Sequence, residues 1–292
     1  EIAIELSPAY LDPEHLEQLS RMGFNRISLG IQDFNENLLK KLNRQPSRYP
    51  IQELYQKAKQ TGFESVNFDF VYGLPGQTFE DHIESIRKAT QIAPERIVTF
   101  SYAHVPWFKE HQKKLEAYHL PEADEKLRML EASFNLLTEN QYTAIGMDHY
   151  AKPDDELSIA LNNKTLQRNF QGYCTKEKTG QVYAFGVTGI SQLTQGYSQN
   201  TRSLEQYNHC IENNQLPVFR GYKLSREEKI RRTVLSEIMC NHYIDLRTIG
   251  NQYDADEKEL KQIIRYQPEQ LQEFADDGLL NFDEHTIRVT SS

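Results

Sequence analysis

The first third of the chain alternates short apolar stretches with longer amphipathic ones. The short stretches are rich in β-branched and aromatic residues, which is typical of strands. They cover residues 1–6, 25–32, 65–73 and 96–105. Between them apolar residues recur every three or four positions, as they do in helices. Asp12 and Thr78 are placed to cap two of these helices, and Gly62 is placed to end another. Strands that alternate with helices in this way predict an α/β fold with a parallel sheet, and we expect part of a βα barrel over residues 1–105.

Each predicted strand has one set of alternate positions that is large and apolar and one that is small or polar. Because strand side chains alternate between two faces, each set occupies one face of the sheet. The small or polar sets are Glu1, Ala3 and Glu5; Arg26, Ser28, Gly30 and Gln32; Asn67, Asp69 and Val71; Thr99, Ser101 and Ala103. We expect the apolar sets, with Val98, Phe100 and Tyr102 in the fourth strand, to meet the helices. The polar sets would then line a lumen with room for a large ligand, although each residue alone is also compatible with a hydrogen-bonded structural role.

The middle of the chain follows a different pattern. A long amphipathic helix is predicted over about 121–140, and residues 146–157 read as an irregular polar stretch. Residues 181–192 are rich in glycine and small side chains. We expect this segment to approach a ligand or another backbone segment closely.

The last part of the chain predicts helices over 225–242, 256–266 and 268–277, followed by a hairpin, which together are typical of a winged-helix module. A winged helix can bind DNA or serve as a packing or lid module. The acidic residues of its second and third helices favour packing, since they would repel phosphates. These residues are Asp254, Asp256, Glu257, Glu259, Glu269 and Glu273. We therefore predict three parts: barrel strands and helices over 1–142, a segment covering the ligand over 143–222, and the winged-helix-like domain over 223–292.

Composition places the chain among ordinary globular proteins. It has 292 residues, of which 38% are hydrophobic and 26% charged, and a net charge of −9 that disfavours a general nucleic-acid surface. No run approaches the roughly 20 apolar residues that span a bilayer, and no signal peptide is visible. Cys174, Cys210 and Cys240 are too widely spaced for a disulfide framework or a close-spaced metal motif. These features predict a cytoplasmic protein with no membrane contact and no nucleic-acid partner.

Several phrases of the sequence carry a family resemblance, in the order and spacing seen in one family. They are EIAIEL, FNRISLGIQDFNENLLKKLNR, NFDFVYGLPGQT, SYAHVP, GMDHYAKPDDEL, LQRNFQGY and GVTGIS. Together they resemble the oxygen-independent coproporphyrinogen III oxidases (dehydrogenases), radical S-adenosylmethionine (SAM) enzymes of haem biosynthesis. The resemblance covers nearly all of the chain and implies an incomplete radical-SAM-type barrel followed by a mostly α, winged-helix-like C-terminal domain. GMDHYAKPDDEL and RNFQGY are more specific to this family than YGLPGQT is.

The resemblance also implies which residues hold two SAM molecules. The implied cofactor-binding positions are Glu5, Gln32, Arg44, Asp69, Ala103, Phe170, Gln171 and Ile190, with Phe170 and Gln171 near the second SAM. Carboxylates accept hydrogen bonds from ribose hydroxyls, and the fork of Arg44 suits the methionine carboxylate. Ala103 would offer a backbone carbonyl to adenine, and Phe170 and Ile190 would pack on the ligand. No catalytic residue and no metal ligand is assigned, and His149 reads as a polar core residue.

The implied activity is the oxidative decarboxylation of coproporphyrinogen III to protoporphyrinogen IX. In this family a reduced [4Fe–4S] cluster cleaves SAM, and the resulting 5′-deoxyadenosyl radical removes a hydrogen atom from a propionate. Loss of CO₂ and one electron then leaves a vinyl group. An electron donor protein such as flavodoxin or ferredoxin and a monomeric state are also implied.

The cysteine triplet that holds the cluster in this family is absent from the 292 residues. We therefore expect the chain to be a piece of a longer enzyme that alone binds no cluster and has no oxidase activity. Two alternatives are a haem chaperone of the same superfamily and a protein whose cluster-bearing half is a separate partner. A third, from another class, is a winged-helix transcription regulator, which the acidic helices disfavour.

Overall fold

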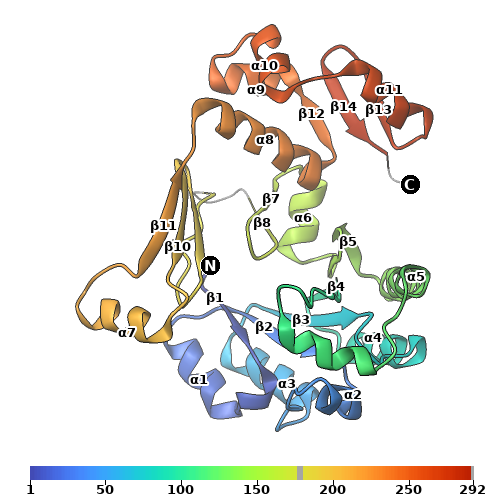
Figure 1. The fold of residues 1–292 in the computed structure, drawn as a ribbon, viewed down its shortest axis with the longest axis vertical. Helices are drawn as coiled ribbons and strands as arrows, with labels where there is room; N and C mark the ends of the chain where they lie inside the picture. Colours follow the sequence, from blue (N-terminus) through green and yellow to red (C-terminus); the bar gives the residue numbers. More distant parts are fainter. Residues whose placement is uncertain (176–179, 291–292) are drawn as a thin grey trace. The chain divides into compact units, whose positions relative to one another are not determined.

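A computed structural model describes residues 1–175 and 180–290 of the chain (Figure 1). The chain divides into two compact units, Glu1–Ser158 and Ile159–Ser292. Each unit has a hydrophobic core built from its own residues.

The first unit is built on a six-stranded sheet in the order β1-β2-β3-β4-β6-β5. Its strands are β1 (Ala3–Leu6), β2 (Arg26–Gln32), β3 (Ser65–Tyr72), β4 (Arg96–Ser101), β5 (Thr143–Gly146) and β6 (His149–Ala151). The pairs β1–β2, β2–β3 and β3–β4 are parallel, whereas β6 runs antiparallel to β4 and to β5. The predicted parallel βα arrangement is therefore confirmed for the first four strands.

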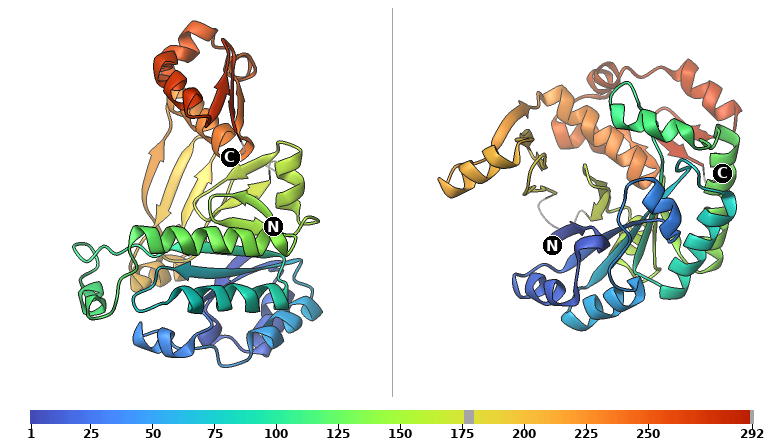
Figure 2. Two further views of the ribbon diagram at one scale, coloured as in Figure 1. Left: turned by 90° about the vertical axis from the view of Figure 1, so that its right-hand side faces the viewer. Right: turned by 60° about the horizontal axis from the view of Figure 1, so that its bottom comes forward.

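The helices of the first unit connect these strands and follow the outside of the curved sheet (Figure 2). They are η1 (Pro8–Tyr10), α1 (Pro13–Arg21), α2 (Glu36–Lys41), α3 (Ile51–Thr61), α4 (Phe79–Ile92), η2 (Glu110–Ala117) and α5 (Ala123–Glu139). A further helix, α6 (Glu156–Asn162), begins in the first unit and ends in the second. Asp12 caps α1 by accepting the backbone N–H groups of Glu14 and His15, both at 3.0 Å. Thr78 forms a capping box at the start of α4, and Gly62 ends α3 in the left-handed conformation at φ 99°.

One face of the sheet is packed against these helices. Leu16 of α1, Leu54 of α3 and Ile86 of α4 belong to one buried cluster with Leu29 of β2 and Phe68 of β3. Burial of such side chains contributes roughly 1.5–3 kcal/mol each to stability. The other face of β1–β3 carries the polar residues, as their alternation predicted.

The fourth strand departs from the prediction. Its register pairs Asp69 with Val98 and Phe70 with Thr99, so Val98 and Phe100 lie on the face of Asp69 and Thr99 lies on the helix face. The expectation that Thr99 and Ser101 line the polar face was therefore wrong. In this strand Ile97, Val98 and Thr99 are all buried, so hydrophobicity alone does not distinguish its two faces. The strand also ends at Ser101, and Ala103 lies beyond it.

Residues 146–157, expected to be irregular, contain a strand and the start of a helix. His149–Ala151 forms β6 and pairs with β4, and α6 begins at Glu156. The turn between them is fixed by Asp155, which is buried and accepts hydrogen bonds from Nε of Arg96 at 2.9 and 3.1 Å. This stretch thus extends the sheet beyond β4.

In its described residues, the second unit contains a two-stranded sheet and two three-stranded sheets, β11-β10-β9 and β12-β14-β13. Its strands are β7 (Leu166–Arg168), β8 (Tyr173–Thr175), β9 (Ile190–Leu193), β10 (Gly196–Asn200), β11 (Val218–Lys223), β12 (Tyr243–Asp245), β13 (Leu280–Phe282) and β14 (Thr286–Val289). Its helices are α7 (Leu204–Glu212), α8 (Arg226–Asn241), α9 (Leu246–Tyr253), α10 (Glu257–Ile264) and α11 (Pro268–Asp276).

The glycine-rich segment around 181–192 approaches other backbone closely, as expected. A Cβ on Gly189 would lie 3.1 Å from the carbonyl oxygen of Phe185 and 3.1 Å from Cβ of Ala184. Asn200 holds the segment through Nδ2, which donates to the carbonyl oxygens of Ala184 at 3.2 Å and Gly186 at 2.9 Å. The small side chains here make room for the chain's own backbone.

The C-terminal part contains one more helix than predicted. Helices α8, α10 and α11 and the terminal hairpin agree with the expectation, and α9 lies between α8 and α10. This helix has eight residues, is capped by Asp245 and buries Leu246 and Ile249. It was missed because it is short and carries Gly250, which is unfavourable in a helix interior.

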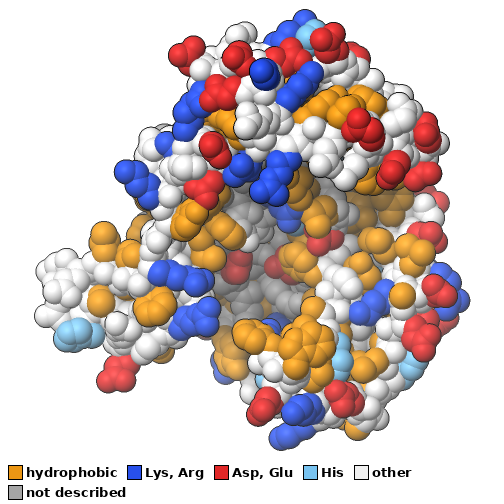
Figure 3. All heavy atoms as spheres, turned by 45° about the horizontal axis from the view of Figure 1, so that its top comes forward, with side chains coloured by type: hydrophobic (Ala, Val, Ile, Leu, Met, Phe, Trp, Pro, Cys, Tyr) orange, Lys and Arg blue, Asp and Glu red, His pale blue; other side chains and the backbone are white. Residues whose placement is uncertain are grey.

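Among the described residues no helix is both long enough and apolar enough to cross a bilayer. On the face shown in Figure 3, acidic and basic side chains are interspersed with apolar ones.

Candidate functional site

The polar face of the first unit centres on Asp69 of β3, which is half-buried. The hydroxyl of Ser28 donates to its Oδ2 at 2.5 Å, and Nδ2 of Asn67 donates to its Oδ1 at 2.7 Å. Asn67 also donates to Oγ of Ser28 at 2.9 Å. Burial raises the pKa of Asp69 and outweighs these two donors, which lower it. The carboxylate is thus fixed in orientation and keeps lone pairs for a ligand.

Glu5 lies on the same face, one strand away. It pairs in register with Ser28, the residue that holds Asp69. Burial raises the pKa of Glu5, and the charge of Asp69 raises it further. Two carboxylates on one partly buried face favour a ligand that brings hydroxyl donors or positive charge.

Gln32 reaches this face through a bulge at the end of β2. The register with β3 shifts between Gly30 and Gln32, and Gln32 has a φ of 69°. A Cβ on Gly30 would lie 2.8 Å from Nε2 of Gln32 and 3.9 Å from Nη2 of Arg44. Because Gly30 pairs with Asp69, the bulge brings Gln32 and Arg44 together on the face of Asp69.

The loop after β2 is fastened to the loop after β3 by a buried carboxylate. Asp33 accepts hydrogen bonds from Nε2 of Gln77 at 2.7 Å, from Oγ of Ser85 at 2.8 Å and from the N–H of Asn35 at 2.6 Å. Gln77 also accepts the N–H of Leu74 at 3.1 Å. The pKa of Asp33 is raised by burial despite these donors. This network, which the sequence did not reveal, holds the backbone next to Gln32.

His149 shares the polar face, two strands from Asp69. Val98 pairs with both Asp69 and His149, which places the three in one row across β3, β4 and β6. Nδ1 of His149 lies 2.7 Å from Oδ1 of Asp148, and its ring packs edge-on against Phe100 at 6.2 Å. The residue is half-buried and partnered, and it also faces the candidate site.

Ala103 and Trp107 follow β4 on an exposed segment. The carbonyl oxygen of Ala103 accepts Nε2 of Gln112 at 3.2 Å, and its second lone pair remains available to a ligand. Trp107 is 79% exposed.

The other three predicted positions lie in the second unit. Phe170 follows β7, is 59% exposed and packs edge-on against Tyr197 at 5.4 Å. Gln171 is exposed, and its N–H donates to Oδ1 of Asn169 at 2.8 Å in a turn. Ile190 is half-buried at the start of β9. Each unit thus contributes its own group of predicted residues.

The cysteines do not fit an iron–sulfur cluster. They lie in separate elements: Cys174 in β8, Cys210 in α7 and Cys240 in α8. Only Cys240 is fully buried. Within residues 1–175 and 180–290, no three His, Cys, Asp or Glu side chains are grouped as metal ligands.

The first unit does fit a nucleoside that carries an amino acid. Glu5 and Asp69 supply acceptors, Gln32 supplies both donors and acceptors, and Arg44 supplies a cation. Gly30 leaves open the space that a Cβ would fill beside Gln32. A pocket of 340 Å³ lined by Phe79, Arg128 and Asn135 lies instead between α4 and α5 and shares no residue with this face.

Comparison with known proteins identifies the parts of the chain. Residues 1–89 match the model of the radical SAM superfamily, whose cofactors are SAM and a [4Fe–4S] cluster, and residues 224–292 match that of the HemN C-terminal domain. A solved structure described as coproporphyrinogen III oxidase (HemN) from Escherichia coli, a radical SAM enzyme, matches with a TM-score of 0.89 at 36% identity. That match covers 99% of this chain and 66% of the other.

Curated relatives agree with the structural match. The oxygen-independent coproporphyrinogen III oxidase of Synechocystis sp. is 42% identical over 87% of this chain and 54% of its own length. That of Escherichia coli K12 is 37% identical over 100% of this chain and 63% of its own length. The chain thus spans between half and two thirds of these two relatives. The protein of the same name from Thermostichus vulcanus is 36% identical, with 88% of its length covered. The chain belongs to the oxygen-independent coproporphyrinogen III oxidase family.

Proposed function

We propose that the chain carries the SAM-binding and substrate-binding part of an enzyme that decarboxylates coproporphyrinogen III oxidatively without oxygen. The observation that carries this proposal is the polar face of β1–β3, on which Glu5, Gln32, Asp69 and the guanidinium of Arg44 all lie. The product is protoporphyrinogen IX, and each of two propionates loses a hydrogen atom, CO₂ and one electron. When bound, SAM supplies the group that abstracts the hydrogen atom.

The residues of the face have separable tasks. Asp69, oriented by Ser28 and Asn67, accepts from ribose hydroxyls of SAM, and Glu5 adds a second acceptor. Arg44 pairs with the methionine carboxylate, and Gln32, at the bulge, hydrogen-bonds to SAM. Ala103 offers its carbonyl to adenine. In the second unit Phe170, Gln171 and Ile190 contact a second SAM molecule.

The protein partners and the compartment are further parts of this proposal. An electron donor protein such as flavodoxin or ferredoxin reduces the enzyme, which acts as a monomer in the cytoplasm. The few, widely spaced cysteines support a reducing compartment.

A chimera tests the function. This chain replaces the matching segment of the Escherichia coli relative, and the purified, anaerobically reconstituted protein is given coproporphyrinogen III and SAM. We expect protoporphyrinogen IX, and we expect Asp69→Asn to lower kcat/KM by about tenfold or more because a charge-assisted acceptor is lost. Asp283→Asn, which alters an exposed carboxylate in the loop between β13 and β14, is the matched control and should keep the parent rate.

The same chimera separates oxidase from haem chaperone. An oxidase forms product without binding haem stoichiometrically. Tight haem binding without decarboxylation would overturn the proposal.

A further inference from the structure

One face of the sheet β11-β10-β9 carries residues that the proposed SAM contacts do not use. Gln199 of β10 pairs with Ile190 of β9 on one side and with Arg220 of β11 on the other, so the three form one row. Tyr197 pairs in the same way with Gln192 and Tyr222 and forms the next row on the same face. Arg220 therefore shares a face with Ile190, a proposed ligand contact.

The centre of this face is aromatic. Phe170, the other proposed contact in this region, packs edge-on against Tyr197 at 5.4 Å, and Tyr222 stands beside Tyr197 on β11. The guanidinium of Arg232 lies 5.7 Å from the centre of the Tyr197 ring and donates to the carbonyl oxygens of Leu193 and Thr194. Arg232 thus packs on the ring of Tyr197, and its guanidinium already donates to backbone carbonyls.

Arg220 is occupied differently. Its Nε donates to Oε1 of Gln199 at 2.8 Å, a neutral partner, and in the described part of the chain no carboxylate forms an ion pair with it. Arg96 and Arg226, by contrast, are paired with carboxylates. Arg220 is exposed, and its two terminal nitrogens offer the parallel donors that bind a carboxylate in a fork.

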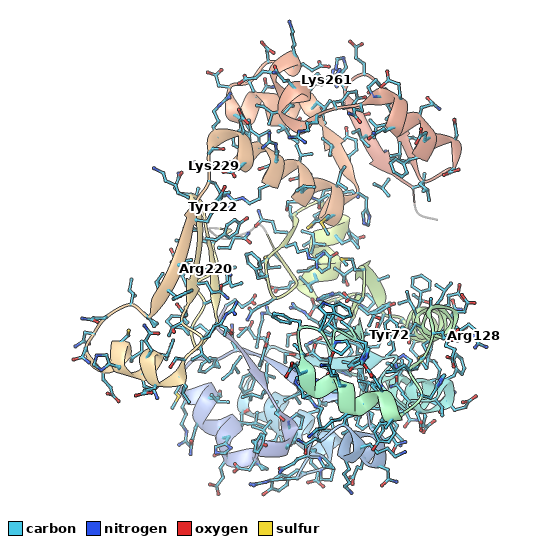
Figure 4. The ribbon with its side chains drawn as sticks, in the orientation of Figure 1. Tyr72, Arg128, Arg220, Tyr222, Lys229 and Lys261 are labelled. Atoms are coloured by element: carbon cyan, nitrogen blue, oxygen red, sulfur yellow. The ribbon has the colours of Figure 1, made fainter. Side chains whose placement is uncertain are left out.

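The acid that contacts this face through Tyr222 is already engaged. Glu228 accepts the hydroxyl of Tyr222 and the N–H of Ser225 at the start of α8. Figure 4 labels Arg220 and Tyr222 on β11 and Lys229 at the start of α8. The ammonium of Lys229 contacts the side-chain oxygen of Gln195. Arg220 and Lys229 therefore place positive charge near the aromatic residues of this sheet.

We propose that Arg220 binds a carboxylate of an amphiphilic polycarboxylate whose apolar rings lie against Tyr197 and Phe170. On the proposed function, on which this inference rests, that carboxylate is one propionate of the porphyrinogen. Gln199 orients the guanidinium of Arg220. Because Ile190, Gln199 and Arg220 lie in one row, this row sets the distance between the bound carboxylate and the part of the ligand near Ile190.

Binding to the full 292-residue chain tests the assignment. Coproporphyrinogen III and its tetramethyl ester are titrated anaerobically by calorimetry, since the ester keeps the rings and removes the charges. We expect Arg220→Ala to weaken binding of the acid by about tenfold or more and to leave the ester unchanged, because one charge-assisted pair is lost. Arg220→Lys should bind the acid more tightly than Arg220→Ala but less tightly than the parent, because lysine keeps the positive charge and lacks the two parallel donors of arginine. Arg247→Ala, at an exposed arginine of α9, is the control and should bind both as the parent does.

The chimeric enzyme gives a second readout. Arg220→Ala should raise KM for the acid about tenfold while kcat stays within about twofold, since the residue binds rather than reacts. A parent-like KM in an active chimera, or equal loss of acid and ester binding, would show that Arg220 is not the receptor and would leave the proposed function standing. An inactive parent chimera would overturn the function instead, while acid-selective binding lost in Arg220→Ala would still support the site.

Discussion

At the scale of single residues, the first unit keeps one imidazole neutral in its core. His82 of α4 is fully buried, and its Nε2 lies 2.7 Å from Oγ of Ser133 in α5. Because Ser133 donates its own hydrogen to the carbonyl oxygen of Met129 at 2.8 Å, Nε2 of His82 carries the hydrogen in this pair. Nδ1 is buried without a hydrogen-bond partner among the described residues. Burial lowers the pKa of His82 to about 4, since a proton on Nδ1 would have no acceptor.

This depressed pKa makes stability depend on pH. The unfolded chain binds the proton near the ordinary pKa of 6.5, so the contribution of neutral His82 to the free energy of unfolding is complete above pH 6.5. This contribution falls as the pH drops toward the pKa of the folded state. At pH 5 the parent should lose about 2 kcal/mol relative to pH 7.5, a loss that His82→Gln should not show. Urea unfolding at both pH values measures this, with His119→Gln, at an exposed histidine, as control. Equal losses in parent and His82→Gln would refute the assignment.

At the scale of elements, the sequence predicted most of what a repeating pattern specifies. The alternation in β1–β3 placed Glu5, Ser28, Asn67 and Asp69 on one face correctly, because each strand has one clearly apolar set. The pattern failed in β4, where consecutive buried residues hide the parity and only the register with Asp69 reveals it.

Other features of the site were beyond a pattern of hydrophobicity. The bulge that turns Gln32 over Gly30 depends on local backbone geometry, and the contacts of Asp33 join loops that are far apart in sequence. β6 is only three residues long, and it becomes a strand by pairing with β4. The positions assigned to SAM came from the family resemblance, and they stay predictions.

The bulge itself supports a prediction. Gly30→Ala would place a Cβ 2.8 Å from Nε2 of Gln32, and the flexible amide would have to move away. We expect stability to change by less than about 1 kcal/mol and SAM affinity to fall by about tenfold, the cost of one well-formed hydrogen bond. Calorimetric titration measures the SAM affinity of Gly30→Ala, of Gln32→Ala and of the double variant.

The double variant decides how Gly30 acts. If the added methyl group lowers SAM affinity only by displacing Gln32, Gly30→Ala will hardly change the affinity further in a chain that already carries Gln32→Ala. Additive losses would mean that the methyl group blocks the ligand directly.

At the scale of the whole molecule, the two cores are separate in sequence. The first cluster draws its residues from Leu11 to Tyr150, and the cluster of the C-terminal part draws its residues from Ile230 to Ile263. We propose a domain boundary near 222–223, which the three-part division of the sequence predicted.

A C-terminal domain with its own core should fold alone. We expect residues 224–292 to unfold cooperatively in urea, and Ile249→Ala to destabilise them by about 2–5 kcal/mol, since this buried side chain fills the cluster. Leu279→Ala, at a 44% exposed position, should cost much less. Circular dichroism during urea titration provides the measurement, and a gradual, non-cooperative loss of helix would argue against an independent domain.

The separation of the two cores also bears on how the chain is made. Synthesis proceeds from the N-terminus, and the 158 residues of the first unit include every member of its hydrophobic cluster. At about 5–20 residues per second, the ribosome needs on the order of ten seconds to add residues 159–292. That interval is long compared with the folding time of most small domains. The sheet that carries Asp69 can therefore form before the C-terminal helices leave the ribosome, and its assembly during translation does not depend on them.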